Sequence, residues 1–202
     1  ELFSREIFDP FGGLEDIRRR LIRYPRREAL KEDPLRMVKA VRHLSTLQDF
    51  SLDPELSAAI TEDVELVRRA APERVKYELD LIMLSQNPHR GVVALLETGL
   101  LFLLFPELGA LREMDQEKGF ELETLGHTIE GFSYIARAGQ VYPCDEQEIK
   151  CAAYGLLFHD LGKVEISHDL IIKPGRLTDE EYDQIKEHSL NSVRQIVKLN
   201  AP

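Results

Sequence analysis

From residue 35 onward, the chain carries the hydrophobic period of α-helices almost without interruption, and this pattern limits its fold more than any other feature. Apolar residues recur three and four positions apart, as at Leu35, Val38 and Val41, a spacing that lines one face of a helix. The alternation typical of strands is nearly absent, apart from a strand end expected within residues 7–13, before a Gly-Gly turn. The pattern therefore predicts an all-α protein with helices over residues 35–47, 54–70, 72–85, 91–98, 101–112, 122–138, 145–158 and 178–199.

Composition narrows the class of protein further. The chain has 202 residues, of which 43% are hydrophobic, enough for one sizeable core or two small ones. The longest apolar stretch, residues 92–105, is interrupted by Glu97 and Gly99 and is too short to cross a bilayer. Cys144 and Cys151 form no disulfide framework and no export signal is visible, so we expect a protein of the reducing cytoplasm with no membrane partner.

Charge is distributed unevenly along the chain. The net charge is −10, yet residues 15–42 contain ten basic side chains against five acidic ones. The arginines of the segment RRRLIRYPRR (residues 18–27) account for most of this excess. A basic segment in an acidic chain favours a local surface that contacts phosphates over a general nucleic-acid coat, and a solvated helix face is the alternative.

Two adjacent acidic residues stand directly before a proline, and three and four residues before an arginine, in the segment LKEDPLRMVKAVRH (residues 30–43). One interpretation is capping, with Asp33 as the N-cap and Pro34 as the first helical residue. The other places Asp33 and Arg36 together on the first helical turn, where a carboxylate acceptor beside guanidinium donors can pair with cytosine or adenine. Uracil and guanine present the reverse pattern, so this pair would leave their polar groups unsatisfied.

The segment EDPLR (residues 32–36) is one of four that occur in order, the others being DPFGGLEDI (9–17), ERVKYEL (73–79) and GLLFLLFPEL (99–108). Together they resemble the end of the catalytic head, the neck and the body of class II tRNA nucleotidyltransferases and bacterial poly(A) polymerases. The resemblance implies that Asp33 and Arg36 read an incoming ATP or CTP, and that Glu32 and Arg74 help to fix them. At Lys39 and His43 the sequence departs from the family, which often has arginine and usually has phenylalanine at these positions.

In that family, metal-bound carboxylates of an N-terminal head perform the transfer step, and nothing before Asp9 could supply them. The chain is therefore expected to be a part of the enzyme that lacks the head, with nucleoside triphosphates and an RNA 3′ end, from tRNA or another RNA, as partners. CCA, CC, a single A and a poly(A) tail all remain compatible products. The expected division is a head remnant over residues 1–25, a helical neck and body over 26–112 and a second helical unit over 118–202. The body helices should end near residue 111, and the second unit should begin near residue 122 after a polar joint.

The second half carries histidines in a pattern of its own. The tripeptide GHT (residues 126–128) is followed by LLFHDLGK (156–163), where His159 and Asp160 end an apolar stretch. Imidazole and carboxylate groups suit divalent transition metals, and His127 can converge with the His-Asp pair on one ion. An isolated His-Asp pair would more often be structural, whereas the full pattern is more specific.

This pattern resembles the HD phosphohydrolase superfamily. The resemblance implies that His127, His159 and Asp160 bind a divalent ion (Mg, Mn or Ni), which activates water for attack on a phosphoester, and that Lys163 contacts phosphate. The later KPGRLT turn resembles HD variants in which a further histidine, here His188, is also a ligand. The final aspartate ligand of the superfamily would fall beyond residue 200, so the HD domain is expected to be incomplete at its C-terminal end.

Two classes of function therefore compete. In the first, the chain is part of an RNA 3′-end nucleotidyltransferase with an appended HD domain. In the second, it is a stand-alone HD-type phosphohydrolase whose N-terminal helices only bind RNA or pack. A third interpretation treats both motifs as structural relics, and the oligomeric state is left open.

Overall fold

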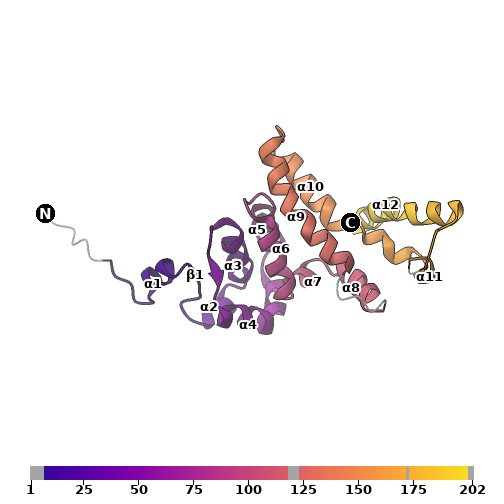
Figure 1. Cartoon of the computed structure of the whole chain (residues 1–202). Coiled ribbons are helices and arrows are strands. Elements are labelled where there is room, and N and C mark those ends of the chain that lie inside the picture. The colour runs from indigo at the N-terminus through magenta and orange to yellow at the C-terminus, as the bar shows by residue number, and fades with distance from the viewer. Residues whose placement is uncertain (1–6, 118–122, 172, 200–202) are drawn as a thin grey trace.

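Helices follow one another along almost the whole computed structural model, which describes residues 7–117, 123–171 and 173–199, and they confirm the predicted all-α class (Figure 1). The α-helices are α1 (Gly13–Arg18), α2 (Glu28–Glu32), α3 (Leu35–Thr46), α4 (Pro54–Asp63), α5 (Pro72–Met83), α6 (Pro88–Glu97), α7 (Leu100–Leu104), α8 (Leu108–Glu117), α9 (Glu123–Val141), α10 (Glu146–Phe158), α11 (His168–Ile171) and α12 (Asp179–Leu199). The 3-10 helices are η1 (Val64–Arg69) and η2 (Leu161–Glu165). The strands β1 (Leu21–Ile22) and β2 (Ser51–Leu52) form one short parallel pair, with Leu21 opposite Ser51.

Local sequence signals set the starts of several helices. Asp53 accepts hydrogen bonds from the backbone N–H groups of Glu55 and Leu56 at the start of α4, and Pro54 follows it as the first helical residue. Asp145 and Glu148 form a reciprocal capping box at the start of α10. The strand end expected within residues 7–13 is wrong for the part that the structure describes, because residues 7–9 form no strand and the turn leads into α1.

Helix α3 lies at the centre of the N-terminal unit. Its residues Met37, Val38 and Val41 have no exposed surface, and α3 packs against both α5 and α6. Gly91 on α6 permits close packing of the three helices, since a Cβ atom there would lie 2.5 Å from Ile82 Cγ2 on α5 and 3.1 Å from Ser45 Cβ on α3. Burial of these aliphatic side chains supplies the main favourable contribution to folding.

The hydrophobic core continues from the N-terminal unit into α9 and α10. Helix α9 packs on α6 and lies beside α10 (Figure 1). Gly131 on α9 allows close contact, because a Cβ atom there would lie 2.8 Å from Leu156 Cδ2 on α10. The Tyr154 hydroxyl donates a hydrogen bond of 2.9 Å to Asp80 Oδ1 and so ties α10 to α5.

The helix predicted over residues 101–112 and the polar joint after it are corrected by the structure. Pro106 lies between α7 and α8, and its missing N–H group interrupts the helix there. Helix α8 then runs to Glu117, past the expected end near residue 111, because residues 112–117 include good helix formers anchored by buried Leu108 and Leu111. The expected start of the second unit near residue 122 lies outside the described residues, and α9 begins at Glu123.

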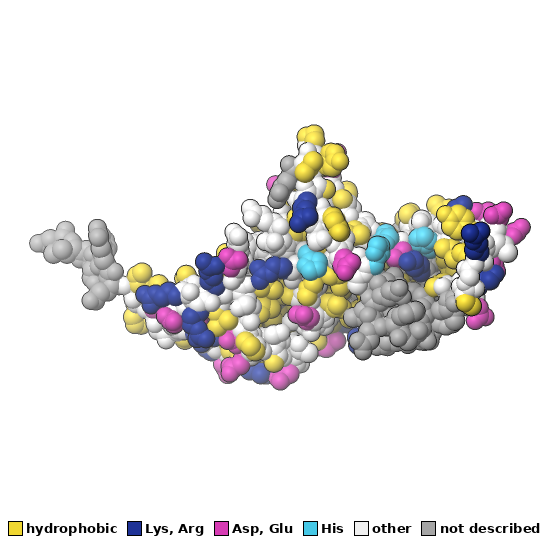
Figure 2. Space-filling view, viewed as in Figure 1, with side chains coloured by type: hydrophobic (Ala, Val, Ile, Leu, Met, Phe, Trp, Pro, Cys, Tyr) yellow, Lys and Arg dark blue, Asp and Glu magenta, His cyan; other side chains and the backbone are white. Residues whose placement is uncertain are grey.

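The molecule is elongated, with α1 at one end and α12 at the other (Figure 1). Helix α1 buries none of its residues. Figure 2 shows hydrophobic side chains at the tip formed by the end of α9 and the segment before α10, where Val141 is 74% exposed. Among the helices of the described ranges, none combines the length and the apolar character needed to cross a bilayer.

Candidate nucleotide-reading site and metal centre

Asp33 lies at the joint between α2 and α3, and its carboxylate caps neither helix. It is the C-cap residue of α2, while α3 starts after Pro34 without any side-chain cap hydrogen bond. The interpretation of Asp33 as the N-cap is therefore wrong. The first turn of α3 is instead closed by the backbone, since the Arg36 N–H donates to the Asp33 carbonyl at 3.0 Å.

The Asp33 carboxylate faces two arginines. Its Oδ2 lies 3.7 Å from Arg74 Nη2 on α5 and 4.0 Å from Arg36 Nε on α3. The Asp33 side chain is 31% exposed, and those of Arg36 and Arg74 are 47% and 54% exposed. Exposed ion pairs at this distance contribute little to stability, so all three side chains remain able to meet a ligand.

Glu32 does not join this group. Its carboxylate pairs with Arg26 at 2.8 Å, whereas the Arg74 guanidinium lies 3.7 Å from the Asp33 carboxylate. Next to Arg74, a depression of about 230 Å³ between α3 and α5 is lined by Leu35, Lys39, Glu73, Arg74, Tyr77 and Glu78. The depression thus places a concave surface next to the exposed ion pair of Asp33 and Arg74.

Behind the depression, Glu78 and Arg42 fix α5 against α3. Glu78 is only 5% exposed and accepts a hydrogen bond of 2.7 Å from Arg42 Nε. A second Arg42 nitrogen, Nη2, lies 2.9 Å from His43 Nε2. Burial and the adjacent Arg42 charge both lower the pKa of His43. Sequence reasoning missed Glu78 as a positioning residue, although a glutamate on an apolar helix face was the available signal.

The arginines of residues 18–27 are largely engaged with carboxylates. Five of them form ion pairs: Arg18 with Glu15, Arg20 with Asp49, Arg23 with Asp16, Arg26 with Glu32, and Arg27 with both Glu62 and Asp63. These pairs are mostly solvent-exposed and can exchange for phosphate contacts at little cost. The anion-binding role of this segment stays a prediction.

The second candidate site surrounds Asp160, just after α10. The Asp160 side chain is 4% exposed, and its Oδ2 lies 3.2 Å from His159 Nε2 and 2.8 Å from Lys163 Nζ. Its other oxygen, Oδ1, lies 3.6 Å from His188 Nε2 on α12. Figure 2 shows histidine side chains beside acidic and basic ones toward this end of the molecule. The fold thus brings His188 of α12 next to the turn at His159 and Asp160, although η2 and α11 lie between them in the sequence.

Backbone carbonyls define the protonation of both imidazoles. His159 Nδ1 lies 2.7 Å from the Leu156 carbonyl oxygen, and His188 Nδ1 lies 2.6 Å from that of Ile185. Because a carbonyl oxygen can only accept, each Nδ1 carries a proton, as in metal-binding histidines, and Nε2 is the atom of each ring that faces Asp160. The Asp160 carboxylate also only accepts, so His159 Nε2 carries a proton when it hydrogen-bonds to Asp160, and a metal ion would have to replace that proton.

The electrostatics of the pair follow from this geometry. The hydrogen bond with Asp160 raises the pKa of His159, against the opposing effect of burial. Burial would raise the pKa of the Asp160 carboxyl, but hydrogen bonds from His159 and Lys163 outweigh it and hold that pKa at about 2. Asp160 is therefore an anion at neutral pH, ready to balance a cation.

The imidazole and carboxylate groups of this site suit a divalent ion, but they are not arranged as a complete set of metal ligands in the structure. His127 lies farther out, with its ring centroid 6.0 Å from that of His159, and Lys163 holds the Asp160 oxygen that a metal would need. Within residues 7–117, 123–171 and 173–199, no three His, Cys, Asp or Glu side chains are already grouped to hold a metal ion. A metal at this site would be held by His159, Asp160 and His188, with His127 beside His159 as a further candidate ligand.

Two residues that sequence reasoning missed place α12 against this turn. The Ser192 hydroxyl on α12 accepts from the Gly162 N–H at 2.8 Å and donates to the His159 carbonyl at 2.7 Å. Gly162 permits the approach, because a Cβ atom there would lie 2.1 Å from the His188 carbonyl oxygen. The spacing of His188 and Ser192, one helical turn apart, was the signal that could have revealed this contact.

The comparisons with known proteins find similarity to a family model of polymerase A and to tRNA nucleotidyltransferases. Residues 49–111 match the family model described as a probable RNA and SrmB-binding site of polymerase A. The chain is 32% identical over 165 residues to the A-adding tRNA nucleotidyltransferase of Deinococcus radiodurans, which covers 79% of this chain and 36% of that protein. It is 30% identical over 169 residues to the multifunctional CCA protein of Burkholderia mallei, which covers 82% of this chain and 39% of that protein.

The chain thus spans well under half the length of these curated relatives. One solved structure is described as a complex of a CCA-adding enzyme with ATP. Its alignment with this chain covers 90% of this chain and 53% of the enzyme chain, at 18% identity and a TM-score of 0.46.

Proposed function

We propose that this chain supplies the nucleotide-reading and RNA-binding helices of an RNA 3′-end nucleotidyltransferase that uses ATP or CTP. The observation that carries the proposal is the Asp33 carboxylate, which caps no helix and lies between the exposed guanidinium groups of Arg36 and Arg74. A carboxylate that only capped the start of a helix would accept hydrogen bonds from backbone N–H groups two or three residues further along the chain. Asp33 instead remains part of an accessible group of donors and acceptors.

The hydrogen-bonding pattern explains the choice of nucleotide. Cytosine and adenine each present an amino donor beside a ring-nitrogen acceptor on their pairing edge. Asp33 can accept from the amino group while an arginine N–H donates to the ring nitrogen. Uracil and guanine present a carbonyl beside a ring N–H, and a mismatched polar group left unpaired in a closed site disfavours binding.

In this proposal the rest of the enzyme performs the transfer step. Nucleotidyl transfer depends on metal-bound carboxylates, which the resemblance assigns to a catalytic head. The helices of this chain select the nucleotide and hold the RNA 3′ end, that of tRNA above all, in the cytoplasm. The match of residues 49–111 to an RNA-binding family supports the second role.

Binding to the isolated chain tests the reading site. The Nε–H signals of Arg36 and Arg74 would be followed by NMR while ATP, CTP, GTP or UTP is titrated. We expect ATP and CTP to shift both signals and GTP and UTP to leave them in place. Equal shifts with all four nucleotides would show a phosphate-only contact and would contradict the proposed base reading.

A second activity, metal-dependent phosphoester hydrolysis, is favoured by the centre around Asp160. Its support is the pair of Nε2 atoms, from His159 and His188, that face a buried carboxylate. A bound divalent ion would supply a Lewis acid that activates water. Lys163, now on Asp160, would be released to contact a phosphate when the ion balances that carboxylate. His127 lies at the outer edge of the same site.

Metal content tests this second activity. The chain would be refolded with manganese or nickel, and bound metal would be measured in the unaltered protein and in the His159→Ala and Asp160→Ala variants. His89→Ala, on α6, is the control. We expect bound metal to fall in His159→Ala and Asp160→Ala and to be unchanged in His89→Ala. Equal metal content in all of them would contradict the site and favour a structural role for the His-Asp pair. Hydrolysis without nucleotide selectivity would instead favour the stand-alone phosphohydrolase.

A further inference from the structure

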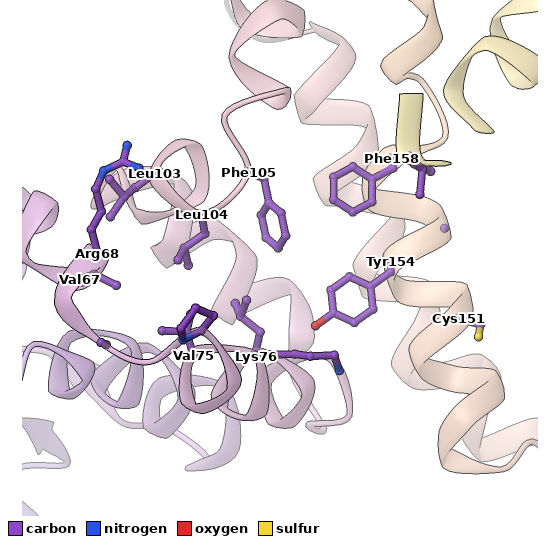
Figure 3. A pocket seen from close by; sticks show the side chains of 15 residues that line it. Val67, Arg68, Val75, Lys76, Leu103, Leu104, Phe105, Cys151, Tyr154 and Phe158 are labelled. Carbon is purple, nitrogen blue, oxygen red and sulfur yellow. The ribbon is translucent and has the colours of Figure 1, made fainter. Parts of the chain in front are cut away.

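Helix α5 borders two hollows on opposite faces. Figure 3 shows Val75 and Lys76 of α5 at an apolar groove beside α10. Arg74 and Tyr77 fall on the other face of the helix, and they line the depression between α3 and α5. Because Arg74 Nη2 also lies 3.7 Å from Asp33 Oδ2, the depression adjoins the proposed nucleotide-reading site and the groove does not.

Tyr77 presents an open aromatic ring at this depression. It is 63% exposed, and its side chain is not one of those that pack into the hydrophobic core. The next residue, Glu78, is buried and accepts a hydrogen bond from Arg42 on α3, which fixes this face of α5. An exposed aromatic ring on a fixed helix is a platform on which a nucleobase can stack, and stacking accepts every base because each has a π-face.

Charge alone would not hold RNA in the depression. Its lining contains the cationic side chains of Lys39 and Arg74 and the carboxylates of Glu73 and Glu78, so the charges of the lining balance. A contact here would therefore come from stacking more than from attraction for phosphates. The volume of about 230 Å³ is below the roughly 300–1,000 Å³ of sites that enclose a whole ligand, and it suits a single base.

The chemistry of nucleotidyl transfer says which base would lie there. The 3′-hydroxyl of the RNA attacks the α-phosphate of the nucleoside triphosphate, and pyrophosphate leaves. The last nucleotide of the RNA must therefore lie beside the incoming one. With the incoming base at Asp33 and Arg36, the depression next to Arg74 is the neighbouring space.

We propose that Tyr77 stacks on the base of the 3′-terminal nucleotide of the RNA and so positions the 3′-hydroxyl for the next addition. The inference rests on the proposed function, because it requires an RNA 3′ end beside the reading site. Stacking is tolerant of sequence, so Tyr77 would hold the growing end whichever nucleotide was added last. Asp33 would then choose the nucleotide that follows.

Binding of an RNA with and without its last base tests the proposal. An RNA hairpin with a single-stranded 3′ overhang, labelled at its 5′ end, would be compared by fluorescence anisotropy with the same RNA whose last nucleotide is abasic. Both would be titrated with the unaltered chain, Tyr77→Ala, Tyr77→Phe and Tyr134→Ala. Tyr134 on α9 is the matched control, since it is 66% exposed. Circular dichroism would verify that each variant keeps its helices.

We expect removal of the last base to weaken binding to the unaltered chain by a factor of roughly 5–150, the usual range for one stacked base. Tyr77→Phe and Tyr134→Ala should show the same factor, because both keep the ring at position 77. Tyr77→Ala should bind the two RNAs equally. Equal binding of the two RNAs by the unaltered chain, or a preference that survives in Tyr77→Ala, would overturn the proposal.

These outcomes are separable from failure of the proposed function. Equal binding of both RNAs, together with selective shifts of the Arg36 and Arg74 signals by ATP and CTP, would overturn the stacking alone. A chain that binds neither RNA would overturn both the stacking and the RNA-binding role. A preference that depends on Tyr77, together with equal shifts by all nucleotides, would support the stacking and contradict the base reading.

Discussion

The Ser192 hydroxyl joins both sides of the His-Asp turn, accepting from the Gly162 N–H at 2.8 Å and donating to the His159 carbonyl at 2.7 Å. Ser192 is 3% exposed, so neither bond can be replaced by bulk water. This side chain helps to hold α12 against η2 and so to keep His188 near Asp160. The proposed metal centre would therefore depend on a residue that does not contact the ion.

Ser192→Ala should weaken both the fold and the proposed metal site. The buried Gly162 N–H would lose its acceptor, which costs about 1–3 kcal/mol of unfolding free energy. Urea denaturation measures this loss, and manganese titration should show weaker binding because His188 is less well placed. Ser133→Ala, at an exposed serine on α9, is the control and should change neither quantity. Unchanged stability in Ser192→Ala would contradict the bridging role.

Gly162→Ala and Gly155→Ala should act in opposite directions. A methyl group on Gly162 would collide with the backbone of α12, because a Cβ atom there would lie 2.1 Å from the His188 carbonyl oxygen, and overpacking of this kind costs about 1–3 kcal/mol. Gly155 has open space, so alanine there should stabilise α10 by about 0.5–1 kcal/mol. Both changes are read from urea midpoints. A tolerated Gly162→Ala would show that α12 is not held closely against η2.

Stability should fall at low pH through Asp160. Its pKa is depressed from 3.8 to about 2, so its ion pairs stabilise the fold above pH 4 and are lost as the pH falls toward 2. The depression corresponds to about 2 kcal/mol. The loss of unfolding free energy between pH 5 and pH 2 should therefore be smaller in Asp160→Asn than in the unaltered chain. Asp183→Asn, at an exposed aspartate of α12, should follow the unaltered chain, and an identical loss in Asp160→Asn would contradict the assignment.

Helix periodicity was enough to predict most of the fold. Apart from residues 101–112, the predicted ranges correspond to helices of the structure, with 54–70 formed by α4 and η1. Their apolar spacing coincides with a buried face, as at Val38 and Val41 of α3. The break at Pro106 was missed, although proline in a helix interior is a strong local signal. The prediction nevertheless continued the helix through Pro106, because apolar residues stand on both sides of it.

The candidate sites were only partly accessible to sequence reasoning. Local motifs identified Asp33, His159 and Asp160, but their partners come from remote parts of the chain. Only the family resemblance pointed to Arg74 as a partner of Asp33, and no motif pointed to the Ser192 bridge, which spans 30 residues. Packing decides such contacts, and a spacing rule along one helix cannot express them.

Nucleotide selectivity with and without the Asp33 carboxylate tests the central claim most directly. These helices would be joined to the catalytic domain of the Deinococcus radiodurans relative, and kcat/KM would be measured for ATP, CTP, GTP and UTP on a tRNA acceptor. Asp183→Ala is the control, since Asp183 also pairs with a basic residue three positions away. We predict that the fusion uses ATP or CTP and refuses GTP and UTP, and that Asp33→Ala loses about 1–3 kcal/mol of that discrimination, a factor of roughly 5–150. An Asp33→Ala enzyme that keeps the full selectivity of the fusion would contradict the account.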